Sequence, residues 1–138
     1  MASLVGSRLD YANSILYGST QHNIARVQRI QNALANVVSG SCPTDHSNSR
    51  LQALHWLPID YRIQYKLAVL TFNACTSSSP HYLSSLINNY QPSRSLRSSN
   101  RHLFGVPRSK SVCSSRGFCT AGPQIWNSLR IPLDSLHP

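Results

Sequence analysis

Residues 58–74 read PIDYRIQYKLAVLTFNA, and this stretch decides the predicted fold. Pro58 suits the first turn of a helix, where its missing N–H costs no hydrogen bond. From there one face collects apolar residues at helical spacing, namely Ile59, Ile63, Leu67, Leu70 and Ala74. The face is widened by Tyr61, Tyr65, Ala68, Val69 and Phe72. A helix that is apolar around most of its circumference is normally buried. The stretch therefore predicts a central helix, with Trp56 and Leu57 closing one end of its core.

The residues before this stretch predict further helices around it. A pattern with a period near 3.6 runs through residues 20–39, and its apolar positions are Ile24, Val27, Ile30, Leu34, Val37 and Val38. Off that stripe lie the polar residues Arg26, Gln28, Arg29 and Asn32. Gly40 is a natural end for this helix, because glycine tolerates the left-handed conformation. Residues 3–17 also have mostly helical spacing up to Gly18, a short helical turn covers 51–54, and another helix starts at Pro80.

The composition changes after Tyr90. Residues 91–116 contain eight serines, six Lys or Arg and no acidic residue, so this segment is predicted to be irregular. Within it, residues 102–106 are compatible with a short strand that ends at Pro107. Residues 117–138 hold a short helix around Ile125, Trp126 and Leu129. The predicted fold is mainly α: a helical bundle over 1–90, a basic Ser/Arg-rich segment over 91–116, and a short helix with a tail over 117–138.

The charge of the chain favours an anionic partner. Thirteen Lys and Arg face four Asp and no Glu among 138 residues, which gives a formal net charge of +9. Such a balance points to nucleic acid first and an acidic membrane surface second, and it also fits docking on an acidic protein. Within the basic segment the candidate nucleic-acid-binding residues are Arg94, Arg97, Arg101, Arg108, Lys110 and Arg116. These side chains would contact phosphates, with Tyr90, His102 and Phe104 as stacking faces nearby. The alternative is a solvated tail kept soluble by its charge.

Other patterns favour structural roles. The rings and charges of Tyr61, Arg62, Tyr65 and Lys66 are interpreted as core with a charged rim rather than as a binding surface. Trp56, Pro58 and Trp126 are the predicted structural residues.

No compartment signal or metal motif is evident in the sequence. The N-terminus lacks a secretion signal, and no apolar run approaches the roughly 20 residues that cross a bilayer. The four cysteines, at positions 42, 75, 113 and 119, form no CxxC pair. We therefore expect reduced thiols, no metal site, no cofactor, no membrane partner, and a location in the nucleus or the cytoplasm.

Catalytic constellations are missing as well. The acids Asp10, Asp45, Asp60 and Asp134 are scattered, and no phosphate-binding glycine loop or nucleophile elbow is present. Asp45, His46 and Ser47 are neighbours in sequence and cannot readily adopt the geometry of a triad. The chain alone is predicted not to be an enzyme.

Seven stretches, taken in order, resemble one protein family. They are SRLDYANSILYG at 7–18, RVQRIQNALANVVSG at 26–40, LHWLPIDYRIQYKLAVLTF at 54–72, PHYLSSLI at 80–87, PSRSLRSS at 92–99, VPRSK at 106–110 and AGPQIWNSL at 121–129. This order resembles the C-terminal region of reverse transcriptases from LINE-type retrotransposons without long terminal repeats, in the jockey-like and chicken-repeat groups. The resemblance covers almost the whole chain.

The resemblance implies a part of an RNA-directed DNA polymerase. In that family this region contributes the helical thumb, which grips the template–primer duplex, together with the segment C-terminal to the thumb. The palm motif, an aromatic residue shortly before Asp-Asp, has no counterpart here, since no two acids are adjacent. The sequence departs from the family at Ala12, where a cysteine is common, and at Arg130, where a proline is usual.

These features are compatible with three interpretations. The first is a non-catalytic fragment of a retrotransposon polymerase with residual affinity for RNA or an RNA–DNA hybrid through its basic residues. The second is a decayed element fragment without activity, which the departures from the family pattern favour. The third is a helical module that docks on a protein partner not identified by the sequence.

Overall fold

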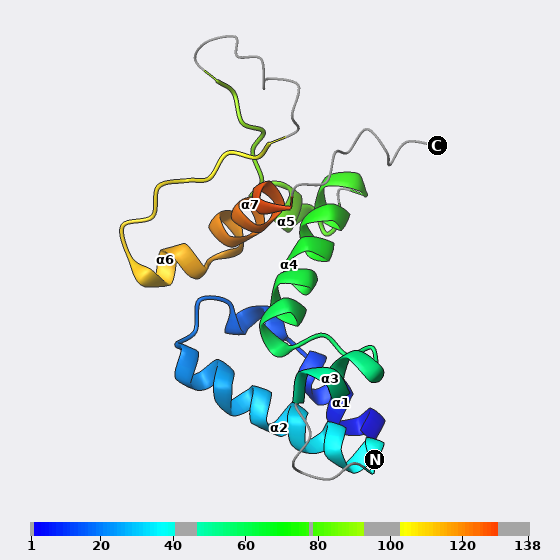
Figure 1. Ribbon diagram of the computed structural model, residues 1–138. Helices are drawn as coiled ribbons and strands as arrows, with labels where there is room; N and C mark the ends of the chain where they lie inside the picture. Colours follow the sequence, from blue (N-terminus) through cyan, green and yellow to red (C-terminus); the bar gives the residue numbers. More distant parts are fainter. Residues whose placement is uncertain (1, 41–46, 78, 93–102, 130–138) are drawn as a thin grey trace. The chain divides into compact units, whose positions relative to one another are not determined.

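The computed structural model describes residues 2–40, 47–77, 79–92 and 103–129, and in these ranges the chain is mainly helical (Figure 1). The prediction of a mainly α fold is confirmed. The chain forms two compact units, Met1–Lys66 and Leu67–Pro138. The boundary between them falls inside the central helix, whereas the compositional boundaries lie after residues 90 and 116.

The longest helix of the first unit is α2 (Gln21–Ser39). α1 (Ala2–Asp10) is followed by the 3-10 helix η1 (Asn13–Leu16), α2 and α3 (Ser47–Ala53). The first turns of α4 (Ile59–Thr76) complete the unit. Both α1 and α3 pack against α2. α2 ends as predicted, at Gly40 in the left-handed conformation with φ of 61°.

The predicted continuous helix over 3–17 is wrong, because the chain turns after α1. Ala12 adopts a left-handed conformation with φ of 52°, which ends α1 and starts η1. The turn brings the side chain of Asn13 into the interior, where it is 5% exposed. Alanine is the best helix former, so local preference gives no warning of a break at this position.

The buried face of α2 is also shifted from the predicted apolar stripe. Gln31 and Ala35 are its buried residues, and Gln28 is half-buried beside them. Val37, which the stripe placed inside, is 80% exposed, and Ile30 is 53% exposed. Hydrogen bonds explain the shift, because Gln31 bonds to the loop before α4 and Gln28 bonds to the first residue of α4.

α4 begins directly after Pro58, as predicted, and the carbonyl oxygen of Pro58 accepts a hydrogen bond from the Arg62 amide at 2.9 Å. Its buried side is narrow and consists of Ile59, Ile63, Leu67, Thr71 and Ala74. The predicted wide apolar face is wrong, since Tyr61 and Tyr65 are 60% and 63% exposed and Phe72 is 42% exposed. A tyrosine tolerates such a position because its hydroxyl stays hydrated.

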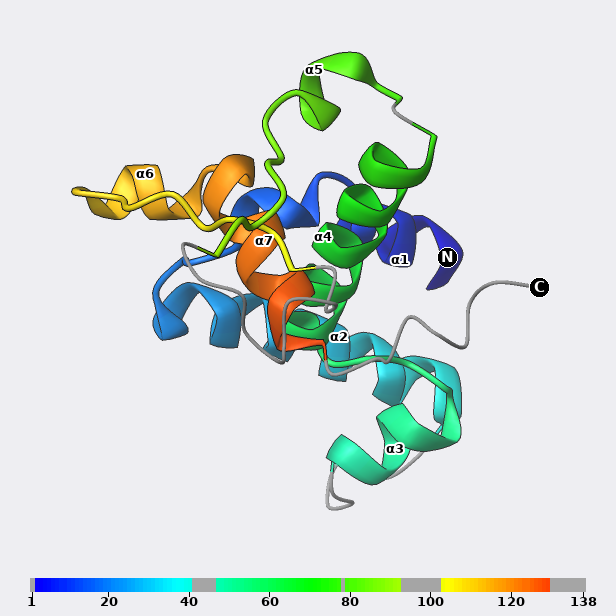
Figure 2. The same ribbon diagram turned by 90° about the horizontal axis from the view of Figure 1, so that it is seen from above.

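The second unit contains the last turns of α4 and three short helices. These are α5 (His81–Ser84), α6 (Val112–Arg116) and α7 (Phe118–Ser128), and Figure 2 shows α6 leading directly into α7. Ser111 caps the start of α6, and its hydroxyl accepts a hydrogen bond from the Ser114 amide. The short terminal helix predicted around Trp126 is thus part of α7. The strand expected over 102–106 is reduced to a single antiparallel bridge between Asn89 and Phe104.

Trp126 links two segments of this second unit. Its ring stacks on Phe72 of α4 with centroids 6.3 Å apart and tilts against Phe104 at 5.6 Å. The neighbouring Asn127 side chain accepts a hydrogen bond from the amide of Phe104 and donates one to its carbonyl, at 3.0 and 2.9 Å. The segment around Phe104 is therefore fixed to α7 by a ring contact and by two hydrogen bonds.

The Gly122→Ala substitution is expected to destabilise the chain by about 1–2 kcal/mol, although alanine is the better helix former. A Cβ atom at Gly122 would lie 2.8 Å from Oγ1 of the buried Thr71, so the packing of α7 on α4 must shift. The matched control is Gly6→Ala in α1, where nothing lies within 4 Å of the new atom. That variant should gain about 0.5–1 kcal/mol. Urea unfolding of both variants tests the pair, and an equal gain in both would contradict the close packing of Gly122 on Thr71.

Candidate nucleic-acid interface

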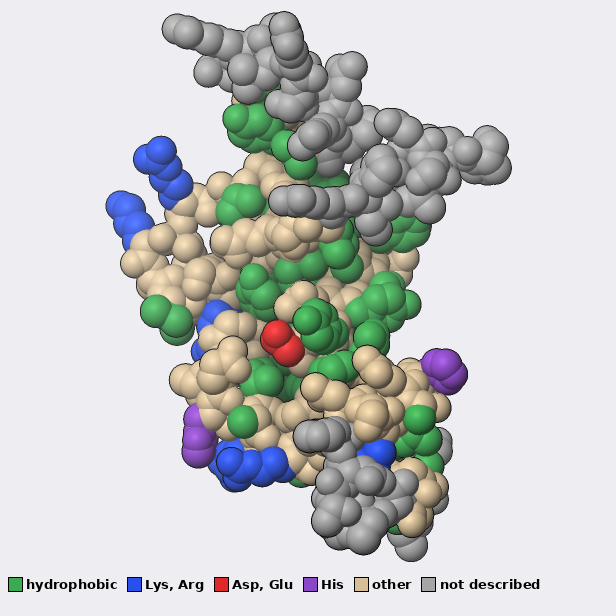
Figure 3. Space-filling view, viewed as in Figure 1, with side chains coloured by type: hydrophobic (Ala, Val, Ile, Leu, Met, Phe, Trp, Pro, Cys, Tyr) green, Lys and Arg blue, Asp and Glu red, His purple; other side chains and the backbone are tan. Residues whose placement is uncertain are grey.

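Three of the six predicted binding residues lie on the segment that leads into and through α6. Arg108, Lys110 and Arg116 are all exposed, and Figure 3 shows Lys and Arg side chains standing clear of the surface in this region. The other three, Arg94, Arg97 and Arg101, fall outside the described residues. The described part of the basic segment thus presents its cations to solvent.

Acidic residues are lacking in the sequence around these cations. From residue 61 to residue 133 the sequence contains nine Lys and Arg but no Asp or Glu. Surface charges interact over roughly 10 Å at moderate ionic strength, and local acids normally weaken such a field. The described part of the second unit has no acidic residue that could weaken the positive field. Arg108 and Lys110 therefore contribute to a positive field suited to a polyanion.

The predicted stacking faces differ in their availability. Tyr90 is 52% exposed and can offer its ring to a base. Phe104 is only 8% exposed because it packs against Trp126, so the prediction that it stacks on a ligand is wrong. His102 lies outside the described ranges.

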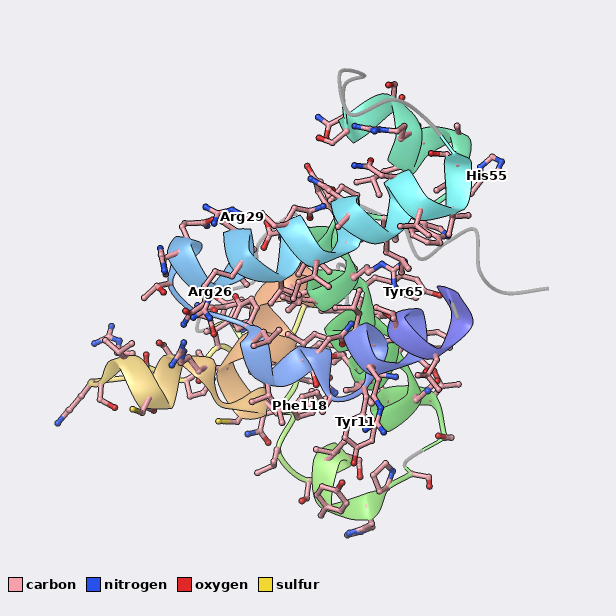
Figure 4. The ribbon with its side chains drawn as sticks, turned by 90° about the horizontal axis from the view of Figure 1, so that it is seen from below. Tyr11, Arg26, Arg29, His55, Tyr65 and Phe118 are labelled. Atoms are coloured by element: carbon pink, nitrogen blue, oxygen red, sulfur yellow. The ribbon has the colours of Figure 1, made fainter. Side chains whose placement is uncertain are left out.

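A second exposed basic pair lies in the first unit and was missed as a site by sequence reasoning. Arg26 and Arg29 project from the first half of α2 (Figure 4). Their spacing of three residues places them on neighbouring positions of one helix surface, which is the signal that could have found them. They belong to a different unit from Arg108 and Lys110.

Arg62, by contrast, has a structural role. One guanidinium nitrogen lies 2.7 Å from the Oδ1 atom of Asp10, and Nε donates to the carbonyl oxygen of Leu57 at 2.9 Å. The side chain thus links α1 to the loop that precedes α4. Lys66 is exposed on the same helix.

The loop before α4 is held by buried amide groups. Nε2 of Gln31 donates to the Leu57 carbonyl at 2.8 Å, and Oε1 of Gln28 accepts from the Ile59 amide at 2.9 Å. The two glutamines are joined by a further hydrogen bond of 3.0 Å. Because the first amides of a helix have no partner within it, Gln28 satisfies one that would otherwise be orphaned. Trp56, predicted to be structural, lies in this loop and is half-buried, while Leu57 is 47% exposed.

Other reactive groups are few within the described ranges. Cys75, Cys113 and Cys119 are free thiols, and desolvation raises the pKa of the Cys75 thiol, which keeps it protonated at neutral pH. No group of three or more His, Cys, Asp or Glu in the part of the chain that the structure describes is placed to hold a metal ion.

Among the helices of the described ranges, none has the length and the apolar character needed to cross a bilayer.

Comparisons of the chain with known protein families, with curated proteins and with solved structures give no match.

Proposed function

We propose that this chain is a non-catalytic nucleic-acid-binding piece of a LINE-type retrotransposon RNA-directed DNA polymerase, acting inside the cell on RNA or an RNA–DNA hybrid. The ordered motifs from residues 7–18 to residues 121–129 support the family. The observation that carries the binding function is the exposure of Arg108, Lys110 and Arg116 in a stretch without acidic residues.

The chemistry of these side chains fits contact with a phosphate backbone. Lys and Arg that neutralise phosphates release condensed counterions, so the affinity falls with added salt in proportion to the number of contacts. Arg94, Arg97 and Arg101 belong to the same basic segment and would add contacts of the same kind. Binding of this type reads the charge and shape of the backbone rather than its base sequence.

The double substitution Arg108→Ala with Lys110→Ala is expected to lower the slope of log affinity against log salt by about one to two units. The measurement is fluorescence anisotropy with a labelled RNA–DNA hybrid between about 50 and 200 mM salt. Stability should change by less than about 0.5 kcal/mol, because both side chains are exposed.

The matched control is Arg26→Ala with Arg29→Ala, an exposed cation pair in the other unit, which should leave the slope unchanged. If the control pair lowers the slope while the Arg108 and Lys110 variant does not, the interface has been assigned to the wrong unit. If neither intact chain nor variants bind the hybrid, the proposed function is wrong.

A further inference from the structure

A cavity of about 660 Å³ opens beside the loop that joins α3 to α4, entirely within the first unit. Its volume lies inside the range of about 300–1,000 Å³ that is usual for small-molecule sites. The residues that line it include Asn48, Leu51, Gln52, His55, Trp56 and Tyr61. None of the basic residues of the proposed interface lines it.

We propose that this cavity binds one unpaired nucleobase of a single-stranded nucleic acid. The proposal rests on the proposed function and adds a second site to it, for a base rather than for phosphate.

Aromatic and apolar residues together line this cavity. Leu51, at 2% exposed, forms part of the apolar lining, while Tyr61 is 60% exposed and Trp56 is half-buried. Figure 4 shows His55 projecting away from the ribbon at the end of α3. Single-stranded sites use such aromatic faces because every base offers a flat ring on which to stack.

The edge of the cavity carries neutral polar groups. Asn48 and Gln52 are exposed, and each amide carries both a donor and an acceptor. Side chains of this kind pair with the edges of bases, where donors and acceptors alternate. No Lys, Arg, Asp or Glu occurs among the described residues that line the cavity, so the ligand group it fits is neutral. A nucleobase has this character, whereas a phosphate does not.

Backbone hydrogen bonds make the wall of the cavity rigid. The Trp56 amide donates to the Leu51 carbonyl at 2.7 Å, and the His55 amide donates to the Gln52 carbonyl at 3.0 Å. Leu57 is fixed from the other side by Gln31 and Arg62. A site held in this way loses little conformational freedom when it binds.

Two occupants would fit the shape of this cavity, a nucleobase and an apolar side chain of a protein partner. The charge of the chain favours the nucleobase. A net charge of +9 draws a polyanion to the molecule, and the amides of Asn48 and Gln52 offer hydrogen bonds that a base edge can use and an aliphatic side chain cannot. We therefore expect the occupant to be a base carried on a nucleic-acid strand.

The first arm of the test uses uncharged nucleosides, so that the basic segment contributes nothing. In a Trp126→Phe variant Trp56 is the one remaining indole, because the sequence has two tryptophans. Titration with adenosine, cytidine, guanosine and uridine should quench its fluorescence saturably, and salt should have no effect. Adding Tyr61→Ala to this variant should shift the quenching curve to about tenfold higher nucleoside concentration. Circular dichroism checks that both variants keep their helices.

The second arm uses the chain with both tryptophans and a short single-stranded oligonucleotide. Tyr61→Ala should weaken binding by about tenfold, the usual effect of removing one stacked ring, while the salt slope stays unchanged. The matched control is Tyr65→Ala, an equally exposed tyrosine one turn further along α4 that does not line the cavity. This control should bind as the unsubstituted chain does.

The two proposals fail in different ways. Equal effects of Tyr61→Ala and Tyr65→Ala, or the absence of nucleoside quenching, would overturn the base site while leaving salt-dependent hybrid binding intact. Quenching by N-acetyl-leucinamide but not by nucleosides would also overturn it and would indicate an apolar protein anchor. Nucleoside quenching without any hybrid binding would instead support the base site and contradict the phosphate interface.

Discussion

Replacement of Trp126 by alanine is expected to lower the free energy of unfolding by about 3 kcal/mol. This is the lower end of the range for buried aromatic residues, because Trp126 keeps part of its ring exposed. The substitution removes the ring that contacts both Phe72 and Phe104, so α4 and the segment before α6 lose their common neighbour. A small domain has about 5–15 kcal/mol in total, and the loss is therefore large. Urea unfolding followed by circular dichroism measures it.

The control for this experiment is Trp126→Phe, which keeps an aromatic ring between the same two partners. It should cost well under half as much as the alanine variant. A Trp126→Ala chain with unchanged unfolding midpoint and slope would show that the ring cluster does not stabilise the second unit.

The second large loss of stability is expected on substitution of Gln31, and here it comes from lost hydrogen bonds. Gln31→Ala should destabilise the chain by about 2–3 kcal/mol, since it empties a fully buried position and removes two hydrogen bonds. The loop with Trp56 and Leu57 loses one of its anchors, so thermal unfolding should begin at a lower temperature.

Gln64→Ala is the matched control, because Gln64 is an exposed glutamine on α4 whose side chain makes only a long contact of 3.5 Å to Asp60. This variant should stay within about 0.5 kcal/mol of the unsubstituted chain. If both glutamine variants unfold alike, the buried amide network contributes no net stability.

The helices themselves could be predicted from local signals in the sequence. Pro58 and the spacing of Ile59, Ile63 and Leu67 identified the start and the buried side of α4. Gly40 identified the end of α2. These signals work because capping, backbone freedom and helical periodicity are properties of a few neighbouring residues.

The buried polar contacts could not be predicted in the same way. Gln31 is buried and Gln28 is half-buried because distant groups offer them partners: the Leu57 carbonyl, 26 residues after Gln31, and the Ile59 amide, 31 residues after Gln28. Hydrophobic patterning assigns glutamine to the surface, and it contains no information about a carbonyl group that is distant in the sequence. Phe104 was misassigned for a related reason, since its partner Trp126 comes 22 residues later.

Part of the candidate interface was predictable and part was not. The exposure of Arg108 and Lys110 is expected for a segment too polar to form a core. The cavity beside Trp56 depends on how α3 meets the start of α4, and no local pattern encodes this meeting.

The division of α4 between the two units has a consequence for any truncation of the chain. Eight of its residues, Ile59–Lys66, belong to the first unit and the remaining ten belong to the second. An isolated helix needs about 12–15 residues to persist in water, so each half would depend on packing within its own unit to remain helical. A cut at the boundary would also remove the backbone hydrogen bonds that cross it, which join each residue of the helix to the one four positions earlier. A shorter chain that ended near residue 66 would therefore carry a frayed helix end, and we expect proteolysis to begin there.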